Sequence, residues 1–113
     1  MTPVTDRAAL EAALAAHPAV LVLYGGQACG VCQAIKPRLG AMLAAEFPRL
    51  EALYVDCQGE VAALCAQQRV FSLPVVELWF EGQRFETFVR AFSLAEVRRA
   101  LQRPYAARFA VHD

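Results

Sequence analysis

Two continuously apolar stretches on either side of a helix-patterned segment constrain the fold of this chain most strongly. The first, AVLVLY at residues 19–24, contains no charged residue, and the second, LEALYVD at residues 50–56, is nearly as apolar. Such runs are typical of central strands in a parallel sheet that helices cover on both faces. Between them, Ile35, Leu39 and Leu43 recur at helical spacing. The pattern therefore predicts a parallel strand–helix–strand unit.

The remaining segments extend this unit into an α/β sandwich. Residues 5–17, 59–68 and 93–102 have helical patterns, and PVVELWF at residues 74–80 reads as a third strand. After an EGQR turn, residues 85–92 alternate as an edge strand antiparallel to the third one. We expect the order helix, strand, helix, strand, helix, strand, strand, helix. The fold class is therefore α/β, with a central mixed β-sheet flanked by helices on both faces.

Local signals near the C-terminus set the expected domain boundary. Ser93 and Glu96 have the spacing of a capping box at the start of the last helix. Pro104 is expected to break that helix, because proline cannot donate the backbone hydrogen bond that a helix interior requires. We therefore predict one domain over residues 1–103, followed by a C-terminal tail over residues 104–113.

Length and composition exclude several classes of protein. A chain of 113 residues suits one domain, and a hydrophobic fraction of 58 % is ample for its core. A formal net charge of zero gives no attraction to nucleic acid or to a membrane surface. No apolar run approaches the roughly eighteen residues of a membrane span, and the N-terminus lacks a signal-peptide pattern. We expect no nucleic-acid or membrane partner and a cytoplasmic location, where thiols stay reduced.

The segment QACGVCQ, residues 27–33, places Cys29 and Cys32 around Gly30 and Val31, just after the first strand and at the start of a helix. Unpaired N–H groups and a partial positive charge at a helix N-terminus favour a thiolate. We therefore expect a lowered pKa for the Cys29 thiol. A thiolate can attack a disulfide, and Cys32 is placed one turn later to resolve the resulting mixed disulfide.

With this pair, three further features make the chain resemble the thioredoxin family over roughly residues 4–103. Pro37 lies five residues after the second cysteine, where thioredoxins have a helix kink. SLPVVELWFEGQ is similar to the cis-proline segment of the family, with Leu73 before Pro74, and FVRAFSLAEVRRAL is similar to its last strand and helix. The resemblance implies a thioredoxin fold and a cis bond between Leu73 and Pro74. It also implies a substrate groove beside Pro74.

The resemblance further implies the chemistry. Cys29 and Cys32 are the expected catalytic residues, and Gly30, Val31, Leu73 and Pro74 are the expected substrate-binding residues. Protein disulfides are the expected substrates and a disulfide reductase is the expected electron donor, with no cofactor and no metal ion. The expected function is thiol–disulfide exchange on partner proteins in the reducing direction.

Several positions depart from the family pattern. The tryptophans of the family are replaced by Ala28 and Gly25, and its buried acid is replaced by Leu23. Ala52 stands where the lysine partner of that acid is expected, and Arg90 replaces a glycine of the groove. These changes leave the reduction potential, the rate of resolution and recognition by a reductase undetermined.

Glu77 is an acidic residue inside an otherwise apolar strand. A buried carboxylate is costly unless it is paired. One interpretation makes Glu77 the proton acceptor of Cys32, in place of the missing acid. The alternative is that it lies at a strand end or pairs with an arginine.

Cys57 and Cys65 form a second, wider pair. If residues 57–65 were one helix, their Cα atoms would lie about 12 Å apart, whereas a disulfide requires less than about 7 Å. This spacing predicts no native bridge, with Cys65 a small buried residue on a helix face. The segment also resembles one in which some animal thioredoxins carry regulatory cysteines, and the role of Cys57 stays open.

Three functions are compatible with these residues. The first is a thiol–disulfide oxidoreductase that uses Cys29 and Cys32. The second is a thioredoxin-fold adaptor with weak or absent redox turnover, because the acid and both tryptophans of the family are missing. The third is a metal site made by all four cysteines, which their spacing disfavours because structural zinc sites prefer two close pairs.

Overall fold

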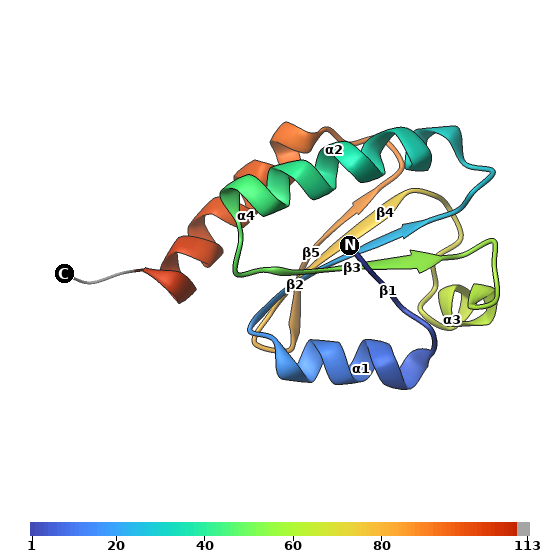
Figure 1. Cartoon of the computed structure of the whole chain (residues 1–113), viewed down its shortest axis with the longest axis horizontal. Coiled ribbons are helices and arrows are strands. Elements are labelled where there is room, and N and C mark those ends of the chain that lie inside the picture. The colour runs from blue at the N-terminus through green and yellow to red at the C-terminus, as the bar shows by residue number, and fades with distance from the viewer. Residues whose placement is uncertain (111–113) are drawn as a thin grey trace.

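The computed structural model describes residues 1–110, which form a five-stranded mixed sheet flanked by four helices (Figure 1). The strand order is β1-β3-β2-β4-β5. β1, β3 and β2 are mutually parallel, whereas β4 pairs antiparallel with both β2 and β5. The strands are β1 (Thr2–Pro3), β2 (Ala19–Gly25), β3 (Glu51–Asp56), β4 (Val75–Phe80) and β5 (Gln83–Val89).

Helices cover both faces of this sheet (Figure 1). α2 and α4 lie on one face, and α1 and α3 lie on the other. The helices are α1 (Arg7–Ala16), α2 (Gly30–Glu46), α3 (Ala62–Gln67) and α4 (Leu94–Phe109). The predicted α/β class, with a mixed sheet between two helical layers, is confirmed.

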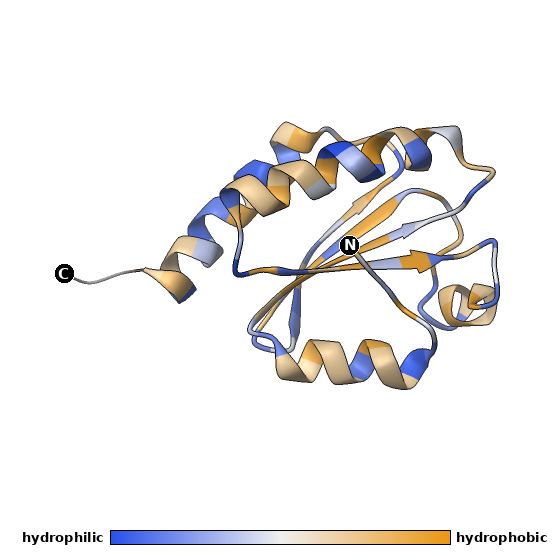
Figure 2. Cartoon of the chain, viewed as in Figure 1, coloured by the Kyte–Doolittle hydropathy of each residue, from blue (hydrophilic) through white to orange (hydrophobic). Residues whose placement is uncertain are grey.

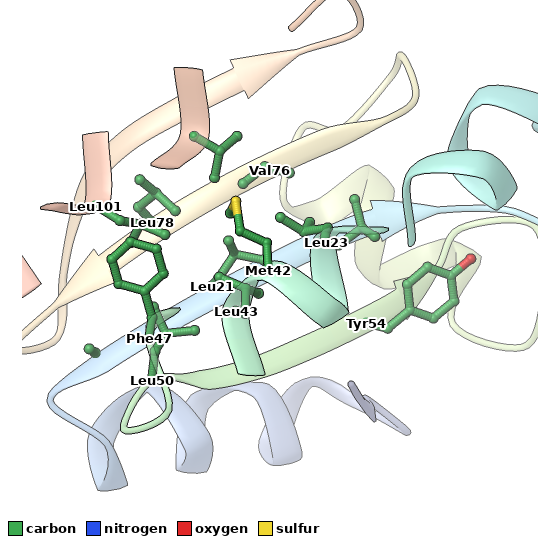
Figure 3. Close-up of a cluster of buried hydrophobic side chains, with 13 residues drawn as sticks. Leu21, Leu23, Met42, Leu43, Phe47, Leu50, Tyr54, Val76, Leu78 and Leu101 are labelled. Atoms are coloured by element: carbon green, nitrogen blue, oxygen red, sulfur yellow. The ribbon is translucent and has the colours of Figure 1, made fainter. Parts of the chain in front are cut away.

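The sheet divides the core into two clusters because side chains of β2 alternate between its faces. Leu21 and Leu23 pack under α2 and α4, whereas Val20 and Val22 pack against α1 and α3. All seven residues of β2 are buried. Figure 2 shows hydrophobic residues along the central strands, and Figure 3 shows the cluster under α2 and α4. Burial on both sides explains why the sequence of β2 is apolar at every position.

Side-chain caps mark the start of two helices. The Asp6 side chain accepts a hydrogen bond from the backbone N–H of Ala9 at 2.8 Å and so caps α1. At the start of α4, Ser93 and Glu96 form the predicted capping box, in which each side chain accepts from the backbone N–H of the other residue. The short β1 strand has no signal in the sequence, since two residues are too few for a period.

The prediction that Pro104 breaks the last helix is wrong, because α4 continues through it to Phe109. The extension is held by aromatic packing, which outweighs the lost backbone hydrogen bond. The rings of Phe47 and Tyr105 meet edge to face at 5.1 Å, and the Tyr105 hydroxyl accepts from the backbone N–H of Arg49 at 3.0 Å. Most of the predicted tail is therefore packed helix, and residues 111–113 of it lie outside the described residues.

None of the helices within residues 1–110 combines the length and the apolar character needed to cross a membrane.

Leu101 tests the packing of α4 on the sheet, because it is fully buried in the cluster under α2 and α4. Leu101→Ala should lower the free energy of unfolding by about 2–5 kcal/mol, through lost burial and the cavity left behind. Its exposed neighbour provides the control, and Gln102→Ala should change the free energy by less than about 0.5 kcal/mol. Chemical denaturation would measure both, and equal effects would contradict the described packing.

Candidate dithiol site

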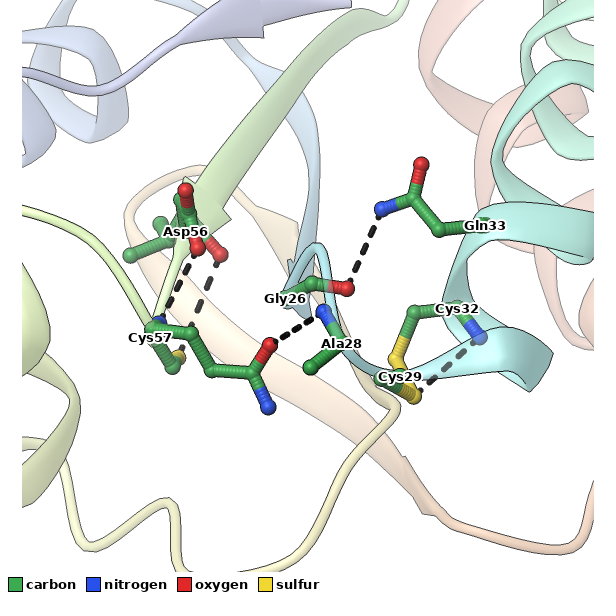
Figure 4. Close-up of a disulfide and its surroundings, with 9 residues drawn as sticks. Gly26, Ala28, Cys29, Cys32, Gln33, Asp56 and Cys57 are labelled. Carbon is green, nitrogen blue, oxygen red and sulfur yellow. Dashed lines mark hydrogen bonds between the residues drawn. A yellow bond between two sulfur atoms is a disulfide. The ribbon is translucent and has the colours of Figure 1, made fainter.

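The two cysteines of the first pair lie at the N-terminus of α2. Cys29 is the N-cap, and its sulfur accepts a hydrogen bond from the backbone N–H of Cys32 at 3.2 Å. The two residues form a disulfide with Cα atoms 5.2 Å apart (Figure 4). Cys29 is partly exposed, whereas Cys32 is fully buried. This asymmetry fits Cys29 for attack on a partner and Cys32 for resolution from beneath.

Sheet register brings the predicted substrate-binding residues to the same end of the molecule. Tyr24 pairs with Val75, so Pro74 stands opposite Gly25, at the edge of the sheet from which the cysteine segment leaves β2. The peptide bond between Leu73 and Pro74 is cis, as the resemblance predicted. On the cysteine side, Val31 is 61 % exposed and is available to a partner.

The loop before the cysteines is fixed by glutamine side chains (Figure 4). The amide of Gln33 donates to the backbone carbonyl of Gly26 at 3.0 Å. The side chain of Gln58, from the loop after β3, accepts from the backbone N–H of Ala28 at 2.7 Å. The position of the first cysteine therefore depends on two separate parts of the chain.

The absence of a side chain at Gly25 leaves room for the Tyr54 ring next to Cys32. A Cβ atom at residue 25 would lie 3.0 Å from the ring and hydroxyl of Tyr54 and 3.2 Å from the Cβ atom of Cys32. Such contacts are tighter than ordinary packing allows, so a larger residue would displace its neighbours. Tyr54 occupies the space that a side chain at position 25 would need, which gives the loss of the family tryptophan a physical reason.

Two charged groups and an amide surround Tyr54. Burial is the main cause that raises the pKa of its phenol, and the nearby Asp56 carboxylate raises it further, whereas the Gln33 amide acts in the opposite direction. The ammonium of Lys36, on α2, lies 3.8 Å above the centre of the Tyr54 ring. This contact is a cation–π interaction of the kind that stabilises a lysine over an aromatic face.

Of the two interpretations of Glu77, the structure supports pairing with an arginine, because the sheet separates its carboxylate from Cys32. Glu77 pairs with Val22 and shares its face, under α1 and α3, whereas Cys32 lies on the α2 face. The carboxylate is only 3 % exposed. It accepts from the Tyr24 hydroxyl at 3.0 Å, the Trp79 indole at 3.2 Å and Arg84 at 3.4 Å. Pairing with an arginine, the alternative interpretation, describes this residue correctly.

The Glu77 carboxylate also affects its tyrosine partner. Burial first, and then the negative charge and hydrogen bond of Glu77, raise the pKa of Tyr24. The neutral phenol is therefore favoured in the folded state, and its contribution to stability is lost only as the pH rises above the ordinary tyrosine pKa of about 10.

The prediction that Cys57 and Cys65 do not bridge is also wrong. They form a disulfide with Cα atoms 5.6 Å apart. The expected separation assumed one helix over residues 57–65, but α3 begins only at Ala62 and the preceding residues form turns. Cys65 is buried on α3 as expected, although it is bonded to Cys57. The backbone N–H of Cys57 donates to the carbonyl of Gly25 at 2.8 Å, which ties this second bridge to the loop before Cys29.

Residues 1–110 contain no group of three or more His, Cys, Asp or Glu side chains arranged to hold a metal ion. Each of the four cysteines is instead paired with another.

Sequence reasoning missed Tyr54, Gln33 and Gln58 as residues of the site. Tyr54 could have been singled out, because a tyrosine inside an apolar strand carries a hydroxyl that needs a polar neighbour. The two glutamines carry no such signal, since their contacts depend on how distant loops meet.

The site combines a cysteine pair at a helix N-terminus with a cis-proline at the start of the adjacent strand of a mixed sheet. This combination is typical of proteins that carry out thiol–disulfide exchange. The thioredoxin family model matches residues 1–103. The chain therefore belongs to the thioredoxin family and is, in general terms, a thiol–disulfide oxidoreductase.

Similar proteins agree with this assignment. The thioredoxin-like protein YdfQ of Bacillus subtilis is 25 % identical over 93 % of this chain and 92 % of its own length. The chloroplastic thioredoxin-like 3-2 of Arabidopsis thaliana is 29 % identical over 58 % of this chain, a match that spans only 34 % of that protein.

Solved thioredoxins have the same fold. The Fasciola hepatica thioredoxin superposes with a TM-score of 0.81 at 25 % identity, over 92 % of this chain and 99 % of that one. The Plasmodium falciparum thioredoxin superposes with a TM-score of 0.79 at 19 % identity, over 91 % of this chain and 99 % of that one.

Glu77→Gln separates the two interpretations of this residue in solution. The variant should lose about 1–3 kcal/mol of folding free energy, because the buried partners of the carboxylate lose a charged acceptor. The rate at which Cys32 resolves a mixed disulfide should not change. Denaturation and single-turnover release of a partner thiol measure the two effects. Glu86→Gln, at an exposed position of β5, is the matched control, and slower resolution in Glu77→Gln alone would contradict the described separation.

Proposed function

We propose that this protein reduces disulfides of partner proteins with the Cys29–Cys32 pair. The observation that carries the proposal is the unequal exposure of the two sulfur-bearing residues at one helix N-terminus, with Cys29 accessible and Cys32 buried. A helix N-terminus favours a thiolate on its N-cap residue. Cys29 is therefore the nucleophile and Cys32 the resolving residue.

The exchange takes place in two steps. The Cys29 thiolate attacks one sulfur of the partner disulfide, forms a mixed disulfide and releases the other partner sulfur as a thiolate. The Cys32 thiolate then attacks the sulfur of Cys29, and the bond between Cys29 and the partner breaks. The partner leaves with both electrons of the pair and takes up protons from solvent. A disulfide reductase then supplies two electrons to restore the dithiol.

The partner segment is proposed to lie in extended form beside Pro74. The backbone of Leu73 would pair with it, as an exposed edge pairs with an added strand. Gly30 and Val31 are both exposed beside the nucleophile and would contact the partner from the helix side. We further propose that the protein works in the cytoplasm, where a reducing pool is available to return electrons.

Turnover of a model protein disulfide, with a chemical dithiol as electron donor, tests the proposal. The wild-type protein should accelerate reduction over the donor alone, and Cys29→Ser should abolish the acceleration, because no nucleophile remains. Cys32→Ser should instead accumulate the mixed disulfide, visible by mass spectrometry. Cys57→Ala/Cys65→Ala is the matched control and should retain turnover.

Two results would contradict the proposal. Equal rates for the wild-type protein and Cys29→Ser would leave the thioredoxin-fold adaptor as the better description. Loss of turnover in the Cys57→Ala/Cys65→Ala control, with its fold intact by circular dichroism, would assign the chemistry to the second pair.

A further inference from the structure

The Tyr54 hydroxyl is a buried polar atom that donates no hydrogen bond among the described residues, and its one polar neighbour of note, the Gln33 amide, acts on it as a donor and gives its own closest contact to Gly26. Tyr54 is only 8 % exposed and belongs to the cluster under α2 and α4. Figure 3 shows its hydroxyl at the rim of that cluster, pointing away from the apolar side chains. A buried hydroxyl that forms no hydrogen bond costs free energy. A hydrogen-bond acceptor supplied in another state of the site would remove this cost.

The position of the hydroxyl points to that partner. A Cβ atom added to Gly25 would lie 3.0 Å from the Tyr54 oxygen and 3.2 Å from the Cβ atom of Cys32. Tyr54 and Leu23 are register partners on the same face of the sheet. The hydroxyl and the Cβ atom of Cys32 therefore approach the same side of Gly25, next to Leu23, the position where the family has its buried acid.

The charged groups around this point come from two elements. Lys36, on α2, places its ammonium over the Tyr54 ring, and the carboxylate of Asp56, at the end of β3, is close enough to raise the pKa of the phenol. Cys29 and Cys32 themselves belong to the start of α2. β2 contributes only Leu23 and Gly25, and neither residue titrates. The Gln33 amide, also on α2, is a second neutral donor near the phenol, and its amide donates to the carbonyl of Gly26.

We propose that the Tyr54 hydroxyl donates a hydrogen bond to the sulfur of Cys32 once the pair is reduced, and so stabilises the Cys32 thiolate for resolution. The proposal rests on the dithiol exchange proposed above and assigns a positioning residue to its second step. Hydrogen bonds to the charged form of a group lower its pKa when the group is an acid. Lys36 adds a positive charge that acts in the same direction.

Tyr54 acts here as a donor and not as a base. Its pKa is raised by burial, so the phenol keeps its proton throughout the exchange. Cys32 loses its own proton to water, and its thiolate then attacks the sulfur of Cys29. The new sulfur–sulfur bond forms as the bond between Cys29 and the partner breaks, and the partner sulfur leaves with the electron pair. The phenol therefore acts differently from a carboxylate, which would accept the proton of the Cys32 thiol.

Tyr54→Phe tests the proposal, with Tyr24→Phe as the matched control. Tyr24 is equally a buried tyrosine of a central strand, but its hydroxyl donates to Glu77 on the opposite face of the sheet. In a Cys29→Ser background, the Cβ carbon resonance of Cys32 reports its ionisation. Tyr54→Phe should raise the pKa of Cys32 so that the thiolate fraction at neutral pH falls about tenfold. Tyr24→Phe should leave it unchanged.

The same substitutions in the wild-type background give a kinetic readout. Single-turnover resolution should slow in Tyr54→Phe at neutral pH and recover the wild-type rate at a pH where Cys32 is fully ionised. A loss that is equal at every pH would indicate a purely structural role and would overturn the proposal. An unchanged Cys32 pKa in Tyr54→Phe would overturn it as well.

Failure of the proposed function gives a different result. If the wild-type protein forms no mixed disulfide with a protein disulfide, the dithiol exchange fails, whereas the Cys32 titration still decides whether Tyr54 contacts that sulfur.

Discussion

The pairing of β2 with β3 on one side and with β4 on the other sets the position of the helices and of the cysteine pair. It places β2 at the centre of the sheet, where helices bury both of its faces and its side chains divide between two cores. Because β4 runs antiparallel to β2, the C-terminal end of β2 lies beside the start of β4. The cysteine pair follows β2 in the chain and the cis-proline precedes β4, so the strand order brings both to the same end of the sheet.

The same sheet separates two polar systems that the sequence alone does not distinguish. On the α1 and α3 face, Glu77 is held by Tyr24, Trp79 and Arg84, which satisfies a carboxylate that would otherwise be costly to bury. On the α2 face, Tyr54 lies beneath the cysteines, where the family has a buried acid and a tryptophan. The site thus contains a neutral phenol and a lysine above it instead of a buried carboxylate.

Much of the fold could be predicted because local patterns agree with the tertiary structure. The apolar run of β2, the capping box at Ser93 and the cysteine spacing each act within a few residues. The errors concern contacts between distant segments. Pro104 stays helical because aromatic rings of α4 pack on Phe47, and Cys57 reaches Cys65 because turns precede α3. Which face Glu77 occupies depends on strand register, which one residue of slip would reverse.

The reduction potential of the Cys29–Cys32 pair, measured at equilibrium with glutathione, would show whether this pair is a functional dithiol. We expect one reversible two-electron couple at about −270 mV, the value of a thioredoxin-like reductant, that disappears in Cys29→Ser. A couple well above about −200 mV would contradict the reducing direction. The absence of any reversible couple at this pair would contradict the claim that its dithiol is the functional centre of the protein.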